Sequence, residues 1–238
     1  MKLIIDIGNT STKLALFDGK EIVRSSNIDA CELLKIERFI SSDIISSSII
    51  SSVKEINSEI LSISDYYKGF ILSENIRVPI KNNYKTSDTL GKDRLAAVVG
   101  ALFLYSEKDI IVFDAGTCLT MDFVNKKGEY IGGRISPGIE MRYKALHTFT
   151  DKLPLVHQEN IASYIGNDTA SSIVSGVQQG ILSEVKLIIS DYRSQNPDTI
   201  AVATGGDCFF FEKELKSSIF ANPNLVMIGL NEILDFNE

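Results

Sequence analysis

The sequence has few of the residues that build zinc sites and disulfide frameworks. It has two histidines and three cysteines in 238 residues. Cys31, Cys118 and Cys208 are widely spaced and lack the paired spacing of a metal-ligand motif. Three cysteines cannot all pair within one chain. We therefore expect a reduced, cytoplasmic protein without a zinc site or a disulfide scaffold.

Positive charge and long hydrophobic runs are also scarce. The net charge is −7 at pH 7, which argues against a nucleic-acid partner because phosphate backbones are bound by a basic face. A phosphate ligand is not excluded, since backbone N–H groups and a magnesium ion can hold one. No apolar run approaches the about 20 residues of a membrane span. The run before Asp6 is too short for a signal peptide.

An internal repeat organises the chain. Residues 3–17 (LIIDIGNTSTKLALF) resemble residues 111–125 (IVFDAGTCLTMDFVN), and Asp6 aligns with Asp114. In each copy an apolar run enters an Asp-x-Gly turn and a second run leaves it, which is the pattern of a β-hairpin.

Further elements follow from periodicity and turn residues. Asp18-Gly19 predicts a second hairpin turn. The remaining predictions are a strand over 44–53, helices over 93–106 and 169–194, a strand over 199–207, and a strand followed by a helix over 225–234.

Two α/β halves that each open with Asp-x-Gly resemble the actin-like ATPase and sugar-kinase superfamily. The resemblance implies an α/β fold of two related actin-like (ribonuclease H-like) halves. Each half would be a mixed β-sheet flanked by helices, with the nucleotide in the cleft between them. A polar break at residues 107–109 predicts that the halves are 1–108 and 109–238.

The first Asp-x-Gly turn combines the groups that a phosphate needs. Its residues are Asp6, Ile7, Gly8, Asn9, Thr10, Ser11, Thr12 and Lys13. Glycine permits close backbone approach, the hydroxyls, amide and ammonium are donors, and a carboxylate can orient magnesium. The alternative is an ordinary hairpin whose Asn and Thr cap the turn. The second turn, with Thr117 after Gly116, repeats the design and favours phosphate binding.

The segment Gly91-Lys92-Asp93-Arg94 opens the helix predicted over 93–106. Transfer of a phosphoryl group to an alcohol needs a base for the hydroxyl proton, and Asp93 is a candidate. Arg94 could hold a carboxylate through two parallel hydrogen bonds. The alternative is that Asp93 caps the helix and pairs with Arg94 on the surface.

Other segments leave two interpretations open. Thr204-Gly205-Gly206 fits a close approach to a flat ligand or a simple strand-to-helix turn. Residues 132–138 (GGRISPG) predict a shaped, non-regular loop, with or without a ligand. Tyr84 is a binding residue or a surface tyrosine, Thr169 a binding residue or a helix N-cap, and the phenylalanines at 209–211 are core or interface.

Together, in this order, these motifs resemble one family, the type III pantothenate kinases, from residue 6 to residue 206. The family's frequent proline before Gly-x-Asp-Arg is missing here, which weakens the assignment of Tyr84. The resemblance implies phosphorylation of pantothenate by ATP, the first step of coenzyme A synthesis, with Mg²⁺ and K⁺ or NH₄⁺. It also implies a homodimer.

The resemblance assigns a role to each candidate residue. Asp6 to Lys13 and Thr117 would contact ATP, with Asp6 near magnesium, and Asp114 would hold the monovalent cation. Asp93 would be the general base. The pantothenate site would consist of Tyr84, Gly91, Lys92, Asp93, Arg94 and Thr169.

Two rival functions remain at this point. Another small-molecule kinase of the superfamily, acting on a sugar or acetate, explains both Asp-x-Gly turns but not the small size or Gly-x-Asp-Arg. A catalytically inactive nucleotide-binding regulator, or an actin-like filament protein, is the non-enzymatic alternative. An inactive relative should lack the base, and Asp93 is present.

Overall fold

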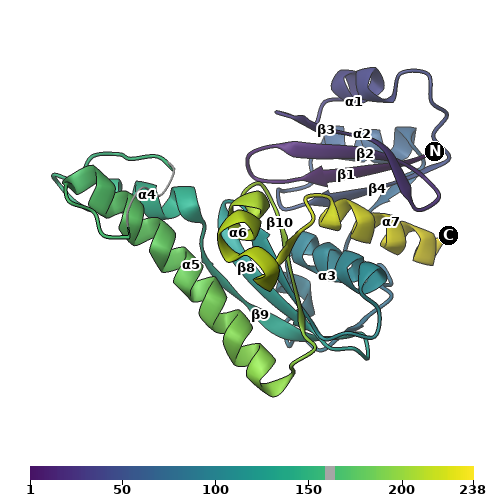
Figure 1. The fold of residues 1–238 in the computed structure, drawn as a ribbon. Helices are drawn as coiled ribbons and strands as arrows, with labels where there is room; N and C mark the ends of the chain where they lie inside the picture. Colours follow the sequence, from purple (N-terminus) through teal and green to yellow (C-terminus); the bar gives the residue numbers. More distant parts are fainter. Residues whose placement is uncertain (159–163) are drawn as a thin grey trace. The chain divides into compact units, whose positions relative to one another are not determined.

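The computed structural model describes residues 1–158 and 164–238 (Figure 1). The described residues form two compact units. The first consists of Met1–Glu107, Val124–Gly132 and Asn224–Glu238, and the second of Lys108–Phe123 and Gly133–Pro223.

The first unit contains a five-stranded sheet in the order β3-β2-β1-β4-β5. Its strands are β1 (Lys2–Ile7), β2 (Thr12–Asp18), β3 (Glu21–Ile28), β4 (Ser47–Ser52) and β5 (Gly69–Ile71). Strands β1, β2 and β3 are antiparallel neighbours, whereas β4 runs parallel to β1 and β5 parallel to β4, so the sheet is mixed. Gly19 has φ 58° in the turn between β2 and β3, which confirms the second predicted hairpin.

Helices cover both faces of this sheet (Figure 1). Leu3, Ile5 and Ile7 alternate along β1 and pack in a core with α1 (Leu33–Ile40) and α2 (Ser58–Tyr66). Ile4 is also fully buried and points to the other face, because successive strand residues alternate. That face contacts α7 (Leu225–Asn237), which packs along α3 (Lys92–Leu104).

A second sheet has the order β11-β10-β7-β8-β9-β6. The strands are β6 (Lys81–Asn82), β7 (Ile110–Ala115), β8 (Cys118–Val124), β9 (Glu129–Pro137), β10 (Ile200–Thr204) and β11 (Phe220–Ala221). Strand β10 runs parallel to β7 and to β11. A link of two residues between β7 and β8 permits only antiparallel pairing. Strand β6 pairs with the start of β9, in the part of β9 that belongs to the first unit.

The two sheets share one strand order, because β9-β8-β7-β10-β11 repeats β3-β2-β1-β4-β5. Each Asp-x-Gly turn joins the equivalent pair of strands, β1 to β2 and β7 to β8. The repeat found in the sequence is therefore a repeat of topology, and the predicted fold class is confirmed. The division into halves 1–108 and 109–238 stays a prediction.

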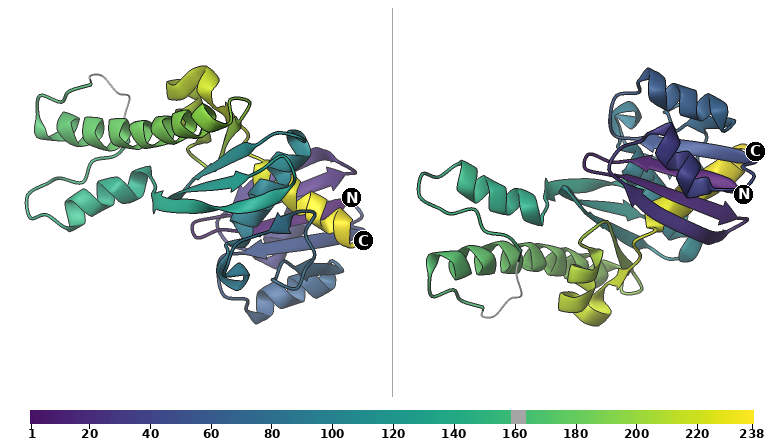
Figure 2. Two further views of the ribbon diagram at one scale, coloured as in Figure 1. Left: turned by 90° about the horizontal axis from the view of Figure 1, so that it is seen from below. Right: turned by 90° about the horizontal axis from the view of Figure 1, so that it is seen from above.

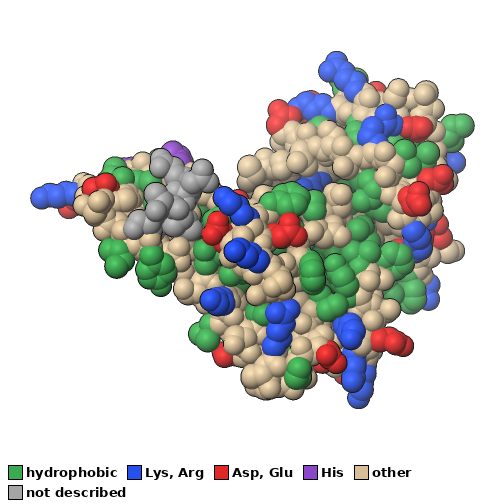
Figure 3. Space-filling view, in the orientation of Figure 1, with side chains coloured by type: hydrophobic (Ala, Val, Ile, Leu, Met, Phe, Trp, Pro, Cys, Tyr) green, Lys and Arg blue, Asp and Glu red, His purple; other side chains and the backbone are tan. Residues whose placement is uncertain are grey.

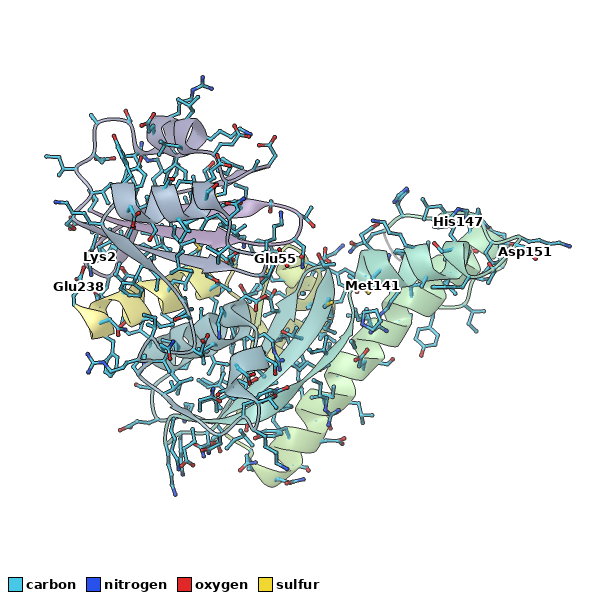
Figure 4. All side chains as sticks on the ribbon, turned by 180° about the vertical axis from the view of Figure 1, so that it is seen from behind. Lys2, Glu55, Met141, His147, Asp151 and Glu238 are labelled. Carbon is cyan, nitrogen blue, oxygen red and sulfur yellow. The ribbon has the colours of Figure 1, made fainter. Side chains whose placement is uncertain are left out.

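The second unit carries α4 (Ile139–Thr148), α5 (Thr169–Gln195) and α6 (Cys208–Leu215). Helices α4 and α5 lie side by side (Figure 2). Met141 and His147 mark α4, and Asp151 the turn beyond it (Figure 4). Two short 3₁₀ helices cover Ser87–Thr89 and Lys216–Ser218. Within the described residues, no helix combines the length and apolarity needed to cross a membrane.

The packing of α3 on α7 depends on two glycines. A Cβ at Gly229 would stand 1.7 Å from the carbonyl oxygen of Ala96, and a Cβ at Gly100 would stand 2.2 Å from that of Leu225. The helices thus meet backbone to backbone. The C-terminal end of α7 lies near the start of β1, where Lys2 pairs with Asp235, and Figure 4 labels Lys2 and Glu238 there.

Three predictions about local structure need correction or resolution. Residues 225–234 belong entirely to helix α7, and the predicted strand is absent there. Residues 132–137 lie within strand β9, so the predicted loop is wrong. Both errors have one cause, since contacts with distant segments, strand pairing for 132–137 and packing on α3 for 225–234, outweighed local turn and periodicity signals. The phenylalanines at 209–211 lie on α6, with Phe211 in the core and Phe209 58% exposed.

Candidate active site

The first Asp-x-Gly turn joins β1 to β2 in the first unit. The backbone N–H of Gly8 donates to the Ser11 carbonyl at 3.0 Å, and a Cβ at Gly8 would stand 3.1 Å from that oxygen. Asn9 and Thr10 are exposed at the tip of the turn, where their polar groups are accessible to a ligand. The side chains of Ile7 and Thr12 are buried, so these two residues can reach a ligand through their backbone.

Asp6 lies at the end of β1, paired with Lys13 on β2 and with Ser51 on β4. The Asp6 Oδ1 and Ser51 Oγ atoms are both buried, and neither has a hydrogen-bond partner among the described residues. Burial raises the pKa of Asp6 to about 6, and the negative charge of Asp93 adds to the rise. Ser51, whose hydroxyl is near but not in good hydrogen-bonding geometry, and Lys13 act in the opposite direction. The unpartnered oxygen and raised pKa indicate a carboxylate built for a ligand.

We expect Asp6→Asn to stabilise the protein at neutral pH. The folded state binds a proton at Asp6 more tightly than the unfolded chain does, so the carboxylate opposes folding above pH 6, and this cost disappears as the pH falls toward 4. Urea unfolding should show the variant more stable by about 1–3 kcal/mol at pH 7 and nearly equal to wild type at pH 4.

The matched control is Asp18→Asn, because Asp18 is an exposed aspartate at the far end of β2. It should change the free energy of unfolding by no more than about 0.5 kcal/mol at any pH. A loss of stability in Asp6→Asn, or a gain that does not vary with pH, would contradict the interpretation of Asp6.

Helix α3 begins with the Gly-x-Asp-Arg motif. Gly91 is its N-cap residue and has no side-chain cap, while the Oδ1 atom of Asp93 accepts the backbone N–H of Arg94 at 2.8 Å. Asp93 therefore satisfies one helix N–H, as the capping alternative required. The other half of that alternative is wrong, because Arg94 is 5% exposed and does not lie on the surface.

Arg94 lies among aromatic side chains from two other segments. Its Nη2 atom donates to the Tyr130 hydroxyl at 3.1 Å, and its Cζ atom is 5.9 Å from the centre of the Tyr84 ring. Tyr84 is half-buried, and its ring also meets that of Tyr130. The motif search missed Tyr130, whose one signal was its place two residues before Gly132-Gly133. Ser51 was missed too, because nothing in its serine-rich strand distinguishes it.

The second Asp-x-Gly turn lies in the second unit, where two other glycines approach it. A Cβ at Gly138 would stand 2.2 Å from the carbonyl oxygen of Gly116, and one at Gly205 would stand 2.5 Å from Asp114 Oδ1. Gly205 also has φ 85°, which favours glycine. Two segments far from the turn in the sequence, around residues 138 and 205, therefore close onto it, and the segment around Gly205 also reaches the Asp114 carboxylate.

The Thr-Gly-Gly segment closes onto the same turn. The N–H of Asp207 donates to the Ala115 carbonyl at 3.0 Å. The Thr204 hydroxyl is buried and has no hydrogen-bond partner among the described residues. Burial, followed by the charge of Glu140, raises the pKa of Asp207. Sequence analysis did not single out Asp207, although it directly follows the two glycines.

Thr169 is the first residue of α5, and it is exposed. The N-cap of this helix is Asp168, whose side chain accepts the Ser171 N–H at 2.8 Å in a capping box. The capping role considered for Thr169 therefore belongs to its neighbour. Thr169 and Thr117 lie in the second unit, whereas Tyr84, Asp93 and Arg94 lie in the first.

No cluster of three His, Cys, Asp or Glu side chains suited to a metal occurs in residues 1–158 and 164–238. A cation at Asp6 or Asp114 would therefore share a single carboxylate with backbone, hydroxyl, water or phosphate oxygens. Such mixed oxygen sets suit hard cations held together with a phosphate ligand.

The repeated sheet and its two glycine turns define an actin-like ATPase and sugar-kinase fold. The activator of the 2-hydroxyisocaproyl-CoA dehydratase from Clostridium difficile, solved with bound ADPNP, is 14% identical with TM-score 0.55, covering 99% of this chain and 93% of that one. A glucokinase from an Antarctic psychrotroph is 12% identical with TM-score 0.54, covering 99% and 98%. These likenesses show the fold alone.

The family is narrower than the fold. The sequence model of the type III pantothenate kinases matches residues 2–191. A type III pantothenate kinase from Bacteroides fragilis is 42% identical over 239 residues, which cover 100% of this chain and 98% of that protein. The chain belongs to the type III pantothenate kinase family. It phosphorylates pantothenate in coenzyme A biosynthesis, with ATP as the phosphoryl donor, and the rival sugar or acetate kinase is thereby set aside.

Proposed function

We propose that Asp93 is the general base that takes the proton from the pantothenate hydroxyl as the phosphoryl group of ATP is transferred. The observation that carries this is the place of Asp93 at the start of α3, near enough to Asp6 at the end of β1 for its negative charge to raise the pKa of Asp6. A base beside the phosphate-binding turn can reach a hydroxyl that attacks the phosphate. A coupled assay should detect ADP release with pantothenate and not with glucose or acetate.

ATP is proposed to bind at the first Asp-x-Gly turn and at Thr117. The exposed tip with Asn9 and Thr10 offers polar groups. Lys13 on β2 is the strand neighbour of Asp6 on β1. The buried, unpartnered Oδ1 of Asp6 fits a magnesium ion or its water, since magnesium prefers carboxylate and phosphate oxygens. Bound magnesium would neutralise charge on the phosphates. The ADPNP in the Clostridium difficile structure supports nucleotide binding in this fold.

Pantothenate is proposed to bind where α3 begins. Gly91 lacks a side chain at a position where a Cβ would stand 2.6 Å from Asp93 Oδ1, so glycine leaves room for that carboxylate. Arg94, Tyr84 and Lys92 surround the same helix end, and the guanidinium of Arg94 suits the carboxylate of pantothenate. The exposed Thr169 remains a proposed contributor from α5.

Asp114 is proposed to hold K⁺ or NH₄⁺. Its carboxylate and the carbonyl oxygen of Ala115 lie beside Gly205, and the carbonyl oxygen of Gly116 lies beside Gly138. The turn therefore offers several oxygen atoms to a cation. Rates in sodium alone should be low and should recover with potassium or ammonium. Asp114→Asn should abolish this recovery, because the cation loses its charged ligand.

The matched control for the cation experiment is Asp109→Asn, which makes the same change just before β7. It should keep the potassium response. Equal rates of wild-type enzyme in sodium, potassium and ammonium would refute the cation site, and an unaltered potassium response in Asp114→Asn would refute its assignment to Asp114.

We also propose that the protein is a homodimer located in the cytoplasm. Large hydrophobic side chains are exposed around α4 and the start of α5, among them Met141, Phe149, Tyr164 and Ile165, and Figure 3 shows hydrophobic surface there. Such exposure is unusual unless another molecule covers it. Cys31, Cys118 and Cys208 form no disulfide within residues 1–158 and 164–238, which supports a reducing compartment.

A further inference from the structure

Tyr130 lies where three segments of the first unit meet. Tyr84 comes from the loop after β6, Arg94 from the first turn of α3, and Tyr130 from β9. Tyr130 is completely buried. Its ring and that of Tyr84 meet edge to face, with centres 5.9 Å apart at 64°. The pairing of β6 with β9 brings these segments together, since Asn82 pairs with Tyr130.

The Tyr130 hydroxyl is one of the groups that hold the Arg94 guanidinium in place. Arg94 Nη2 donates to it at 3.1 Å in a buried setting, and the face of the Tyr84 ring lies 5.9 Å from Arg94 Cζ. A guanidinium presents its N–H donors in one rigid plane, so a bond from Nη2 to a buried, rigid hydroxyl restricts where the remaining donors point. A buried bond of this kind survives because water does not compete for it.

We propose that Tyr130 is a positioning residue for pantothenate, because its hydroxyl aims Arg94 at the substrate carboxylate. The inference rests on the proposed role of Arg94. Tyr130 touches Arg94 and Tyr84 rather than the reacting atoms, so its effect is on substrate affinity. It also selects for a carboxylate, because a wrongly aimed guanidinium loses one of two parallel bonds.

The test is Tyr130→Phe, which removes one oxygen and keeps the ring that packs on Tyr84. Affinity is measured by calorimetry with a non-hydrolysable ATP analogue, so that weakly reactive ligands can be compared. Pantothenate should bind about 10-fold or more weakly than to wild type, because a misaimed guanidinium loses one charge-assisted hydrogen bond to the substrate carboxylate. The KM for ATP and kcat should stay within about twofold.

Pantothenol, in which a primary alcohol replaces the carboxylate, separates aiming from general packing. Tyr130→Phe should change pantothenol affinity by less than about twofold. In the background of Arg94→Gln, the further change Tyr130→Phe should have no effect on pantothenate, because residues that act through one another are not additive. The matched control is Tyr143→Phe. It removes another buried hydroxyl, which accepts a hydrogen bond from the side-chain amide of Gln178 at 3.0 Å. It should leave pantothenate affinity unchanged.

The possible failures are distinguishable. If Tyr130→Phe binds pantothenate like wild type, or loses pantothenate and pantothenol equally, Tyr130 does not aim Arg94 and the inference is wrong. If Arg94→Gln weakens both ligands alike, Arg94 does not bind the carboxylate. That part of the proposed function then fails, and the inference fails with it.

Discussion

Asp93→Asn is expected to lower kcat by about 10²–10⁴-fold, the usual contribution of a general base. The substitution keeps the size of the side chain, and an amide oxygen can still accept the Arg94 N–H that Asp93 Oδ1 accepts at 2.8 Å. What it removes is the ability to take up a proton. Phosphoryl transfer depends mainly on positioning and charge neutralisation, so the remaining activity should still exceed the uncatalysed rate.

The affinity for ATP is a second, independent measurement on Asp93→Asn. Asp93 contributes negative charge that raises the pKa of Asp6. Without that charge, Asp6 should ionise more readily and the phosphates should meet less repulsion. The affinity for Mg·ATP should therefore stay the same or increase slightly in Asp93→Asn, although turnover falls.

Thermal melting separates the base from the helix cap. A large loss of kcat with an unchanged melting temperature supports the base, whereas a lowered melting temperature with near-normal kcat supports the cap and overturns the proposed role. Asp88→Asn is the matched control, since Asp88 is exposed in the short 3₁₀ helix just before α3. It should retain wild-type kcat.

Gly229→Ala should destabilise the protein by about 3 kcal/mol or more. The added Cβ would stand 1.7 Å from the Ala96 carbonyl oxygen and 2.8 Å from the Gly100 nitrogen. Both atoms belong to the backbone of α3, so no side-chain rotation can relieve the clash, and α3 must move away from α7. Overpacking typically costs about 1–3 kcal/mol and exceeds that where the surroundings cannot shift. The gain from higher helix propensity, about 1 kcal/mol, does not offset this cost.

Gly180→Ala is the matched control, because Gly180 is also helical, is exposed in α5, and has no atom within 4 Å of its added Cβ. The free energy of unfolding of Gly180→Ala should stay unchanged or rise by up to about 1 kcal/mol. Urea unfolding of both variants measures the difference. If Gly229→Ala unfolds at the same urea concentration as wild type, α3 and α7 do not pack backbone to backbone. Since α3 carries Asp93, the variant should also lose activity under conditions where it remains folded.

The hairpins and helices that were predicted correctly are those whose sequence signals lie within a few neighbouring residues. The Asp-x-Gly turns, the Asp18-Gly19 turn and the periodic segments that became α3 and α5 each depend on neighbours in the sequence. Each was found where it was expected. The segments that were misassigned, 132–137 and 225–234, are those whose conformation depends on distant partners. The first pairs within a sheet, and the start of the second packs against α3.

The class of fold and the reaction could be predicted from the sequence, because the signals of a repeated Asp-x-Gly hairpin and of an ordered set of short motifs each lie within a few residues. Three features became visible in the folded chain alone: Ser51 lies beside Asp6, Arg94 is buried against Tyr130, and glycines 138 and 205 close onto the second turn. These contacts join residues tens of positions apart. Strand pairing and backbone packing create them, and neither leaves a mark in the spacing of nearby residues.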